Sequence, residues 1–185
     1  MTVLMDRVVT PVLTDLLACL GTALGGTAAG PVGALMLVPG ASATADYCCS
    51  DSGTNGQGWV RLVGITPVLA TNNQTYPAYG SCDANRWVVQ VEMGAYRCAP
   101  TSDDDGNPPT PDELTAAAQV LADDAAAMRR AICCLTSLPK WGPDSDTELA
   151  YTRGAWAPVP TAGGCMGGTQ LFSFEINDCC PVEGS

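Results

Sequence analysis

Ten cysteines in a chain of 185 residues constrain the fold more than any other feature of this sequence. Six of them form three adjacent pairs, Cys48-Cys49, Cys133-Cys134 and Cys179-Cys180, and the chain contains no histidine. The CxxC spacing that is usual for zinc ligands does not occur in this sequence. A zinc site would therefore have to be built from four cysteines with an unusual spacing. Disulfide bonds are therefore the favoured interpretation, with reduced, buried cysteines as the plain alternative.

Nine of the cysteines are candidates for disulfide formation, and nothing in the sequence selects their pairing. These candidates are Cys48, Cys49, Cys82, Cys98, Cys133, Cys134, Cys165, Cys179 and Cys180. Disulfide bonds require an oxidising environment, which a particle that persists outside the cell would provide.

The apolar run Val32–Val38 is followed by an Ala-x-Ala step and a cysteine pair, as in a secreted protein after its signal peptide. However, the run has only seven residues, contains Gly33 and is preceded by 31 residues that include charged side chains. We therefore expect no targeting segment. Glycine and proline also break the apolar region well short of a transmembrane helix, so no membrane association is expected.

Acidic residues outnumber basic residues, which limits the possible partners. The 8 Lys and Arg against 19 Asp and Glu give a formal net charge of −11. Binding to nucleic-acid phosphates needs clustered Lys and Arg, so specific nucleic-acid binding is disfavoured. An acidic ring could still serve DNA, because DNA would slide through it rather than adhere.

Hydrophobic periodicity predicts a single α+β domain over residues 1–185, with an antiparallel sheet of about four strands and two main helices packed on it. The strands are expected at Trp59–Leu69, Arg86–Cys98, 154–159 and 169–178. Residues 27–58 are expected to form a long irregular arm with a contact role, and residues 177–185 a C-terminal tail.

The first expected helix carries an apolar face from Val9 to Leu20 and ends in Gly21–Gly26. Thr10-Pro11 could cap a helix that starts there, or Pro11 could kink a longer one.

The second expected helix begins with Thr110 as N-cap, Pro111 in the first turn and Glu113 completing a capping box. Its apolar stripe consists of Leu114, Ala118, Leu121, Ala125, Met128, Ile132 and Leu135. At 100° per residue, Cys133 and Cys134 lie off this stripe. We therefore expect both to point away from the sheet, where a bridge to a wrapping arm or loop is feasible.

No pattern in the sequence indicates catalysis or a cofactor. The absence of histidine excludes Ser-His-Asp and Cys-His mechanisms as usually built, and no phosphate-binding loop or GxSxG motif occurs. With Gly106 at position 6 of a calcium loop, Asp103, Asp105 and Asp112 would stand at ligand positions, but a solvated acidic turn before the helix is favoured. Asp103, Asp104 and Asp105 are candidates for an acidic loop at an interface or a ring lumen.

Several motifs follow one another in an order that resembles the tail terminator proteins of long-tailed phages infecting actinobacteria. They are DYCC, WVRLVGITPV, SCDANRWVVQVEMGAYRCAPTSDDDGNPPTPDEL, DAAAMRRAICCL and GAWAPVPTAGGCMGGTQLFSFEI, spanning about Asp46 to Ile176. The Cys179-Cys180 pair and the Gly- and Ala-rich stretch 27–45 lie outside the pattern.

The resemblance implies a structural, non-enzymatic virion protein, made in the host cytoplasm and located at the tail–head junction. Tail terminators form a hexameric ring on the head-proximal end of the tail tube, stop its polymerisation and join the head connector. The implied partners are further copies of the chain, the major tail tube protein, the connector or stopper protein and the tape measure protein. DNA would pass through without specific binding, and the arm at 27–58 is the candidate for reaching an adjacent subunit.

Three alternatives come from different classes of protein. A head-side neck protein, either a stopper or an adaptor, is the nearest. A secreted disulfide-rich binding module is the second, and a metal-dependent or redox enzyme is the third.

Overall fold

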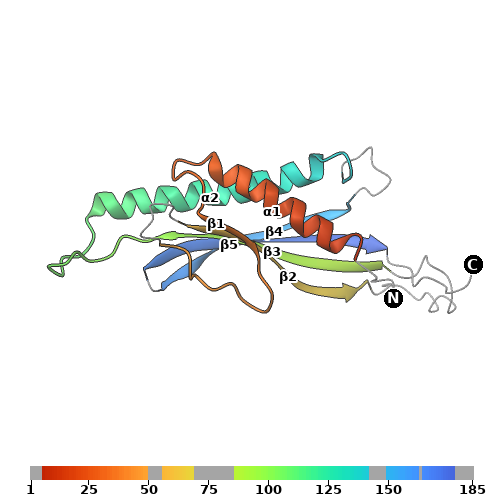
Figure 1. Ribbon diagram of the computed structural model, residues 1–185, viewed down its shortest axis with the longest axis horizontal. Helices are drawn as coiled ribbons and strands as arrows, with labels where there is room; N and C mark the ends of the chain where they lie inside the picture. The colour runs from red at the N-terminus through yellow and green to blue at the C-terminus, as the bar shows by residue number, and fades with distance from the viewer. Residues whose placement is uncertain (1–5, 50–55, 69–85, 142–148, 163, 178–185) are drawn as a thin grey trace, which may run out of the picture.

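A computed structural model describes residues 6–49, 56–68, 86–141, 149–162 and 164–177, and these form an α+β fold with two helices and a five-stranded mixed sheet. The order along the chain is α1 (Val9–Gly25), β1 (Ala34–Leu37), β2 (Gln57–Pro67), β3 (Arg86–Cys98), α2 (Pro111–Ser137), β4 (Tyr151–Ala162) and β5 (Cys165–Asn177). In space the strands run β1-β2-β3-β5-β4 (Figure 1). The two-helix α+β prediction is thus confirmed.

The sheet differs from the prediction by one strand. β1 pairs in parallel with the start of β2, from Ala34 opposite Gln57 to Leu37 opposite Val60, whereas the other three pairings are antiparallel. β1 lies inside the segment expected to be an irregular arm. The described part of that segment therefore packs on its own domain, and its expected reach toward a neighbouring subunit stays a prediction.

Both helices cover the same face of the sheet and lie beside each other (Figure 1). The core between them and the sheet contains Val12, Leu16, Leu20, Val89, Val91, Met93, Met128, Ile132, Phe172 and Phe174. Burial of each such side chain stabilises the fold by roughly 1.5–3 kcal/mol. Successive side chains of a β-strand point to opposite faces of the sheet, so every second residue of β3 and β5 enters this core.

α1 is capped by a residue that the sequence analysis did not identify. The Asp6 carboxylate accepts hydrogen bonds from the backbone N–H groups of Val8 (3.3 Å), Val9 (3.2 Å) and Thr10. Partial burial acts to raise the pKa of Asp6, but these hydrogen bonds together outweigh it and the pKa is lowered. Pro11 lies in the first turn, where its missing N–H removes no helical hydrogen bond, so neither a Thr10 cap nor a kink is needed.

α2 begins as the sequence predicts. The Thr110 hydroxyl accepts a hydrogen bond from the Glu113 N–H (3.3 Å), while the Glu113 carboxylate accepts one from the Thr110 N–H (2.8 Å). Only the second half of the predicted apolar stripe is buried, from Ala125 onward, and Leu114 is 53 % exposed. The first half of α2 therefore presents apolar side chains to solvent.

Candidate functional site

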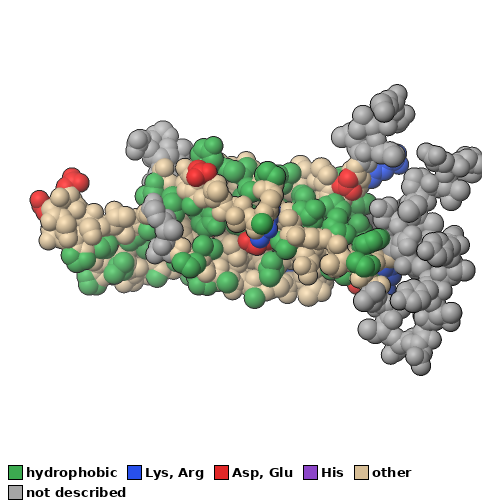
Figure 2. Space-filling view, turned by 90° about the horizontal axis from the view of Figure 1, so that it is seen from below, with side chains coloured by type: hydrophobic (Ala, Val, Ile, Leu, Met, Phe, Trp, Pro, Cys, Tyr) green, Lys and Arg blue, Asp and Glu red, His purple; other side chains and the backbone are tan. Residues whose placement is uncertain are grey.

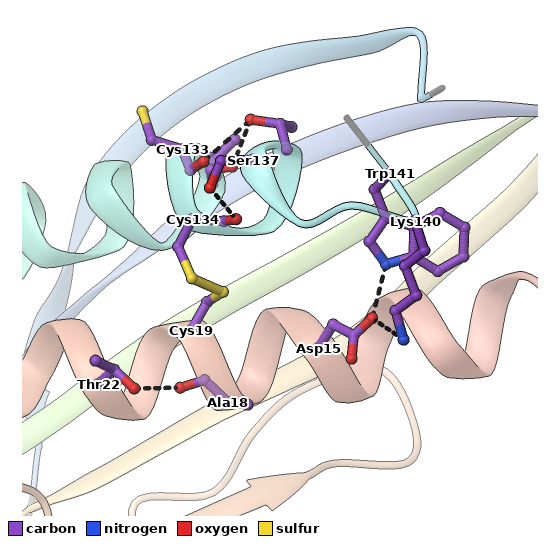
Figure 3. The surroundings of a disulfide bond; sticks show 11 residues. Asp15, Ala18, Cys19, Thr22, Cys133, Cys134, Ser137, Lys140 and Trp141 are labelled. Carbon is purple, nitrogen blue, oxygen red and sulfur yellow. Dashed lines mark hydrogen bonds and ion pairs between the residues drawn. A yellow bond between two sulfur atoms is a disulfide. The ribbon is translucent and has the colours of Figure 1, made fainter. Parts of the chain in front are cut away.

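The described residues contain three disulfide bonds, each joining parts of the chain far apart in sequence. Cys19 of α1 bonds to Cys134 of α2, with Cα atoms 5.8 Å apart (Figure 3). This pairing corrects the expectation that Cys134 points toward a wrapping arm, because α1 lies along the flank of α2 that Cys134 faces. The nine sequence candidates omit Cys19, and the signal that could have found it is its place on the buried face of α1.

Two further disulfides attach the segment after β1 to the sheet. Cys48 bonds to Cys165 at the start of β5, and Cys49 bonds to Cys98 at the end of β3. Cys98 and Cys165 face each other across the β3–β5 ladder. One adjacent pair in the sequence is therefore bound to two neighbouring strands.

The remaining candidates divide into two groups. Cys133 is a free, exposed thiol that accepts a hydrogen bond from Arg153 (Nη2 to Sγ 3.3 Å), and its side chain points away from α1 (Figure 3). Cys82, Cys179 and Cys180 lie outside the described residues, as does most of the expected tail 177–185.

A second, smaller buried cluster lies on the sheet face opposite the helices. Trp59 of β2 and Tyr96 of β3 pack there with Cys48 and Cys165. The residue that follows Trp59 and the residue that precedes Tyr96 point to the other face of the sheet, into the main core. Met36, Val38, Ala43 and Ala45 cover the cluster. The chain after β1 thus crosses beneath the sheet, as Figure 1 shows.

Polar contacts hold the same segment in place. Buried Gln57 accepts a hydrogen bond from the Tyr47 N–H (2.9 Å) and donates one to the Thr44 carbonyl (2.6 Å). Arg61 pairs with Glu92 at 2.6 Å and donates to the Gly40 carbonyl at 3.3 Å. Residues 40–49 are consequently fixed by side-chain contacts as well as by disulfides.

The three candidate acidic residues occupy a turn at one end of the molecule, between β3 and α2 (Figures 1 and 2). Asp103, Asp104 and Asp105 are all exposed. The Asp103 carboxylate accepts hydrogen bonds from the Asn107 side chain (2.9 Å) and backbone N–H (2.8 Å), which lower the pKa of Asp103. The turn is therefore an ordered acidic projection whose first carboxylate is already engaged by its own loop.

β2 continues beyond its pairing with β1. The paired residues end at Val60, so the stretch Arg61–Pro67 has one backbone edge without a strand neighbour among the described residues. Leu62, Val63 and Ile65 of this stretch are 37 %, 40 % and 43 % exposed. β4 forms the opposite edge of the sheet. These two edges differ in length, sequence and surroundings.

A pocket of about 140 Å³ lies between β3, β4 and β5. It is lined by Val88, Ala150, Tyr151, Thr152, Ser173, Phe174 and Glu175. This set contains one carboxylate and three hydroxyl groups, but it does not pair a nucleophile with a base in the usual way. The pocket therefore gives no reaction class.

No protein-family model matches this chain, and the curated proteins contain no match to it either. Within the described residues, neither helix has the length and apolar character needed to cross a membrane.

Proposed function

We propose that this chain is a structural virion protein, the ring-forming tail terminator of a long-tailed phage. In this role it would assemble on the head-proximal end of the tail tube, end tube polymerisation and join the tail to the head connector. The ordered series of motifs between Asp46 and Ile176 suggests the proposal. The structural observation that carries it is a sheet with two unlike open edges.

A ring requires each subunit to present two different, mutually complementary surfaces, because its contacts are head to tail. The Arg61–Pro67 edge offers exposed apolar side chains, together with backbone groups that pair with no strand in the described part of the chain. Such an edge is a template for pairing with another chain and is rarely left long and apolar in a monomer. β4 supplies a second edge on the far side of the sheet.

The charge of the chain agrees with a ring through which DNA passes. The net charge of −11 opposes adhesion to phosphates, and the projecting Asp103–Asp105 turn is the candidate for a lumen or an axial interface. The exposed first half of α2, with Leu114, adjoins this turn and is a further candidate contact for the tube or the connector. The partners proposed are therefore other copies of the chain, the tube protein, the connector and the tape measure protein.

The native mass of the purified full-length chain tests the ring. We expect an assembly of six times the 19.0 kDa of one chain, and Ile65→Lys should shift it to monomers because it places a charge at the apolar edge. Thr66→Lys adds the same charge to the next residue, whose side chain faces the opposite side of the strand, and should retain the ring. A monomeric wild-type chain at high concentration would contradict the proposal.

The alternative is a head-side neck protein, a stopper or an adaptor. An acidic α+β subunit with two open edges also fits that role. The two differ in the place of the ring within the particle, which microscopy of phage lacking the gene would separate.

A further inference from the structure

We infer that the four cysteines Cys48, Cys49, Cys98 and Cys165 form a metal site in the reduced chain, with Zn²⁺ bound by four thiolates. The two disulfides that join them are then the oxidised form of the same ligand set. The sequence argued against zinc because no CxxC spacing occurs, but folding brings together ligands that the sequence separates.

The four sulfurs form one connected cluster, in which the Cys48–Cys49 pair links the two disulfides. A Zn–S bond of about 2.3 Å places the sulfurs of a regular tetrahedron about 3.8 Å apart. The Sγ atoms of Cys48 and Cys49 are 3.7 Å apart. The Sγ atoms of Cys48, Cys49 and Cys165 all lie within 4.8 Å of one another, and the fourth sulfur is bonded to Cys49. Once the two S–S bonds are cleaved, rotation of the cysteine side chains must move the formerly bonded sulfurs apart to about 3.8 Å for them to surround an ion.

Contacts other than the disulfides also hold the two halves of this site. Cys98 and Cys165 are opposite partners in the β3–β5 ladder, so their side chains emerge side by side on the same face. Cys48 and Cys49 follow a segment that Gln57 ties to the sheet through Thr44 and Tyr47. Such contacts lower the cost of ordering the chain when the metal binds.

The surroundings suit a metal–thiolate centre. Cys48 and Cys165 are buried beside Trp59 and Tyr96, whereas Cys49 and Cys98 are exposed. The buried side excludes water, and the exposed side gives an ion or a reductant access to the sulfurs.

The chemistry of interconversion balances with a small-molecule disulfide as oxidant. Two molecules of that disulfide accept four electrons from the four zinc-bound thiolates and take up four protons, giving four small thiols. The protein forms two S–S bonds and releases Zn²⁺. In a reducing cytoplasm the metal form is favoured, and outside the cell the disulfide form is favoured. Either form anchors residues 40–49 to the same two strands.

The test begins with the full-length chain made in a reducing bacterial cytoplasm and purified anaerobically. We expect about one zinc ion per chain by elemental mass spectrometry. Replacement by Co²⁺ should give the absorption of tetrahedral cobalt with sulfur ligands. Exposure to a small-molecule disulfide should release the zinc to a chromogenic chelator and form the Cys48–Cys165 and Cys49–Cys98 bonds, detected by peptide mapping.

Variants separate this site from the other cysteines. Cys49→Ser/Cys165→Ser should lose the zinc, whereas Cys19→Ser/Cys134→Ser and Cys82→Ser/Cys179→Ser/Cys180→Ser should retain it. The cobalt spectrum of the reduced wild-type chain is a readout that does not depend on any variant folding. A wild-type chain without zinc and without the sulfur–cobalt spectrum would overturn the inference. The inference would also be overturned if Cys49→Ser/Cys165→Ser kept its zinc while Cys82→Ser/Cys179→Ser/Cys180→Ser lost it.

Discussion

Arg97 of β3 and Asp124 of α2 form a two-point ion pair inside the protein. The Arg97 Nε lies 3.0 Å from one carboxylate oxygen of Asp124, and Nη2 lies 3.0 Å from the other. The two residues are 3 % and 2 % exposed, and Arg97 also donates to the Thr27 hydroxyl at 3.4 Å. The pair joins the sheet, the long helix and the segment after α1, so it fixes where α2 lies on the sheet.

Asp124→Asn should destabilise the fold by about 3–5 kcal/mol, because it leaves the buried guanidinium of Arg97 without a compensating charge. Urea unfolding measures the loss. Asp123→Asn is the matched control, since Asp123 is half-buried and makes no ion pair within the described structure, and its effect should stay near zero. Equal losses in the two variants would show that the pair does not contribute as described.

The Cys19–Cys134 disulfide should stabilise the chain independently of the four-cysteine cluster. It closes a loop between residues 115 apart, and its removal by Cys19→Ala/Cys134→Ala should lower the free energy of unfolding by about 2–4 kcal/mol. Cys133→Ala removes the adjacent free thiol and should change stability little. An unchanged midpoint of denaturation in the double variant would argue against a bond between the helices.

Gly94 provides space for the ring of Trp59, its cross-strand partner. A Cβ at position 94 would overlap the Trp59 ring and lie 3.0 Å from the Gly168 carbonyl oxygen. Gly94→Ala should therefore cost about 1–3 kcal/mol, typical of overpacking. Gly64→Ala in β2 meets no atom within 4 Å and should be nearly neutral, so thermal unfolding of the two variants isolates the packing effect.

The capping box of α2 should be visible in the titration of Glu113. Hydrogen bonds from the Thr110 backbone N–H and hydroxyl lower the pKa of Glu113 below its ordinary 4.5. Because the folded pKa is the lower one, the cap stabilises the fold fully above pH 4.5 and loses this effect as the pH falls through the folded pKa.

Thr110→Ala should therefore raise the Glu113 pKa toward 4.5 in a carboxyl NMR titration. Thr115→Ala removes a nearby hydroxyl that bonds to the Pro111 carbonyl instead, and it should leave the Glu113 pKa unchanged. If the pKa of Glu113 stayed low in Thr110→Ala, the Thr110 hydroxyl would not contribute, and the backbone N–H of residue 110 would account for the whole shift.

Local patterns predicted most of the helices and strands. Thr110, Pro111 and Glu113 mark the start of α2, and the alternation of Phe172, Phe174 and Ile176 marks β5.

These local patterns could not predict which parts of the chain pack against one another. β1 has four residues in a region rich in glycine and proline, and it is a strand only because β2 lies beside it. Cys134 bonds to Cys19 because α1 packs along α2, which no periodicity within one helix reveals. The four-cysteine cluster depends on the β3–β5 register and on the path of the chain beneath the sheet.

Electron microscopy of lysates from the phage without this gene tests the proposed function most directly. A tail terminator predicts tail tubes of overlong and scattered length beside heads that carry no tails. Tails of normal length lying apart from heads would contradict it and place the protein on the head side of the neck, as a stopper or an adaptor.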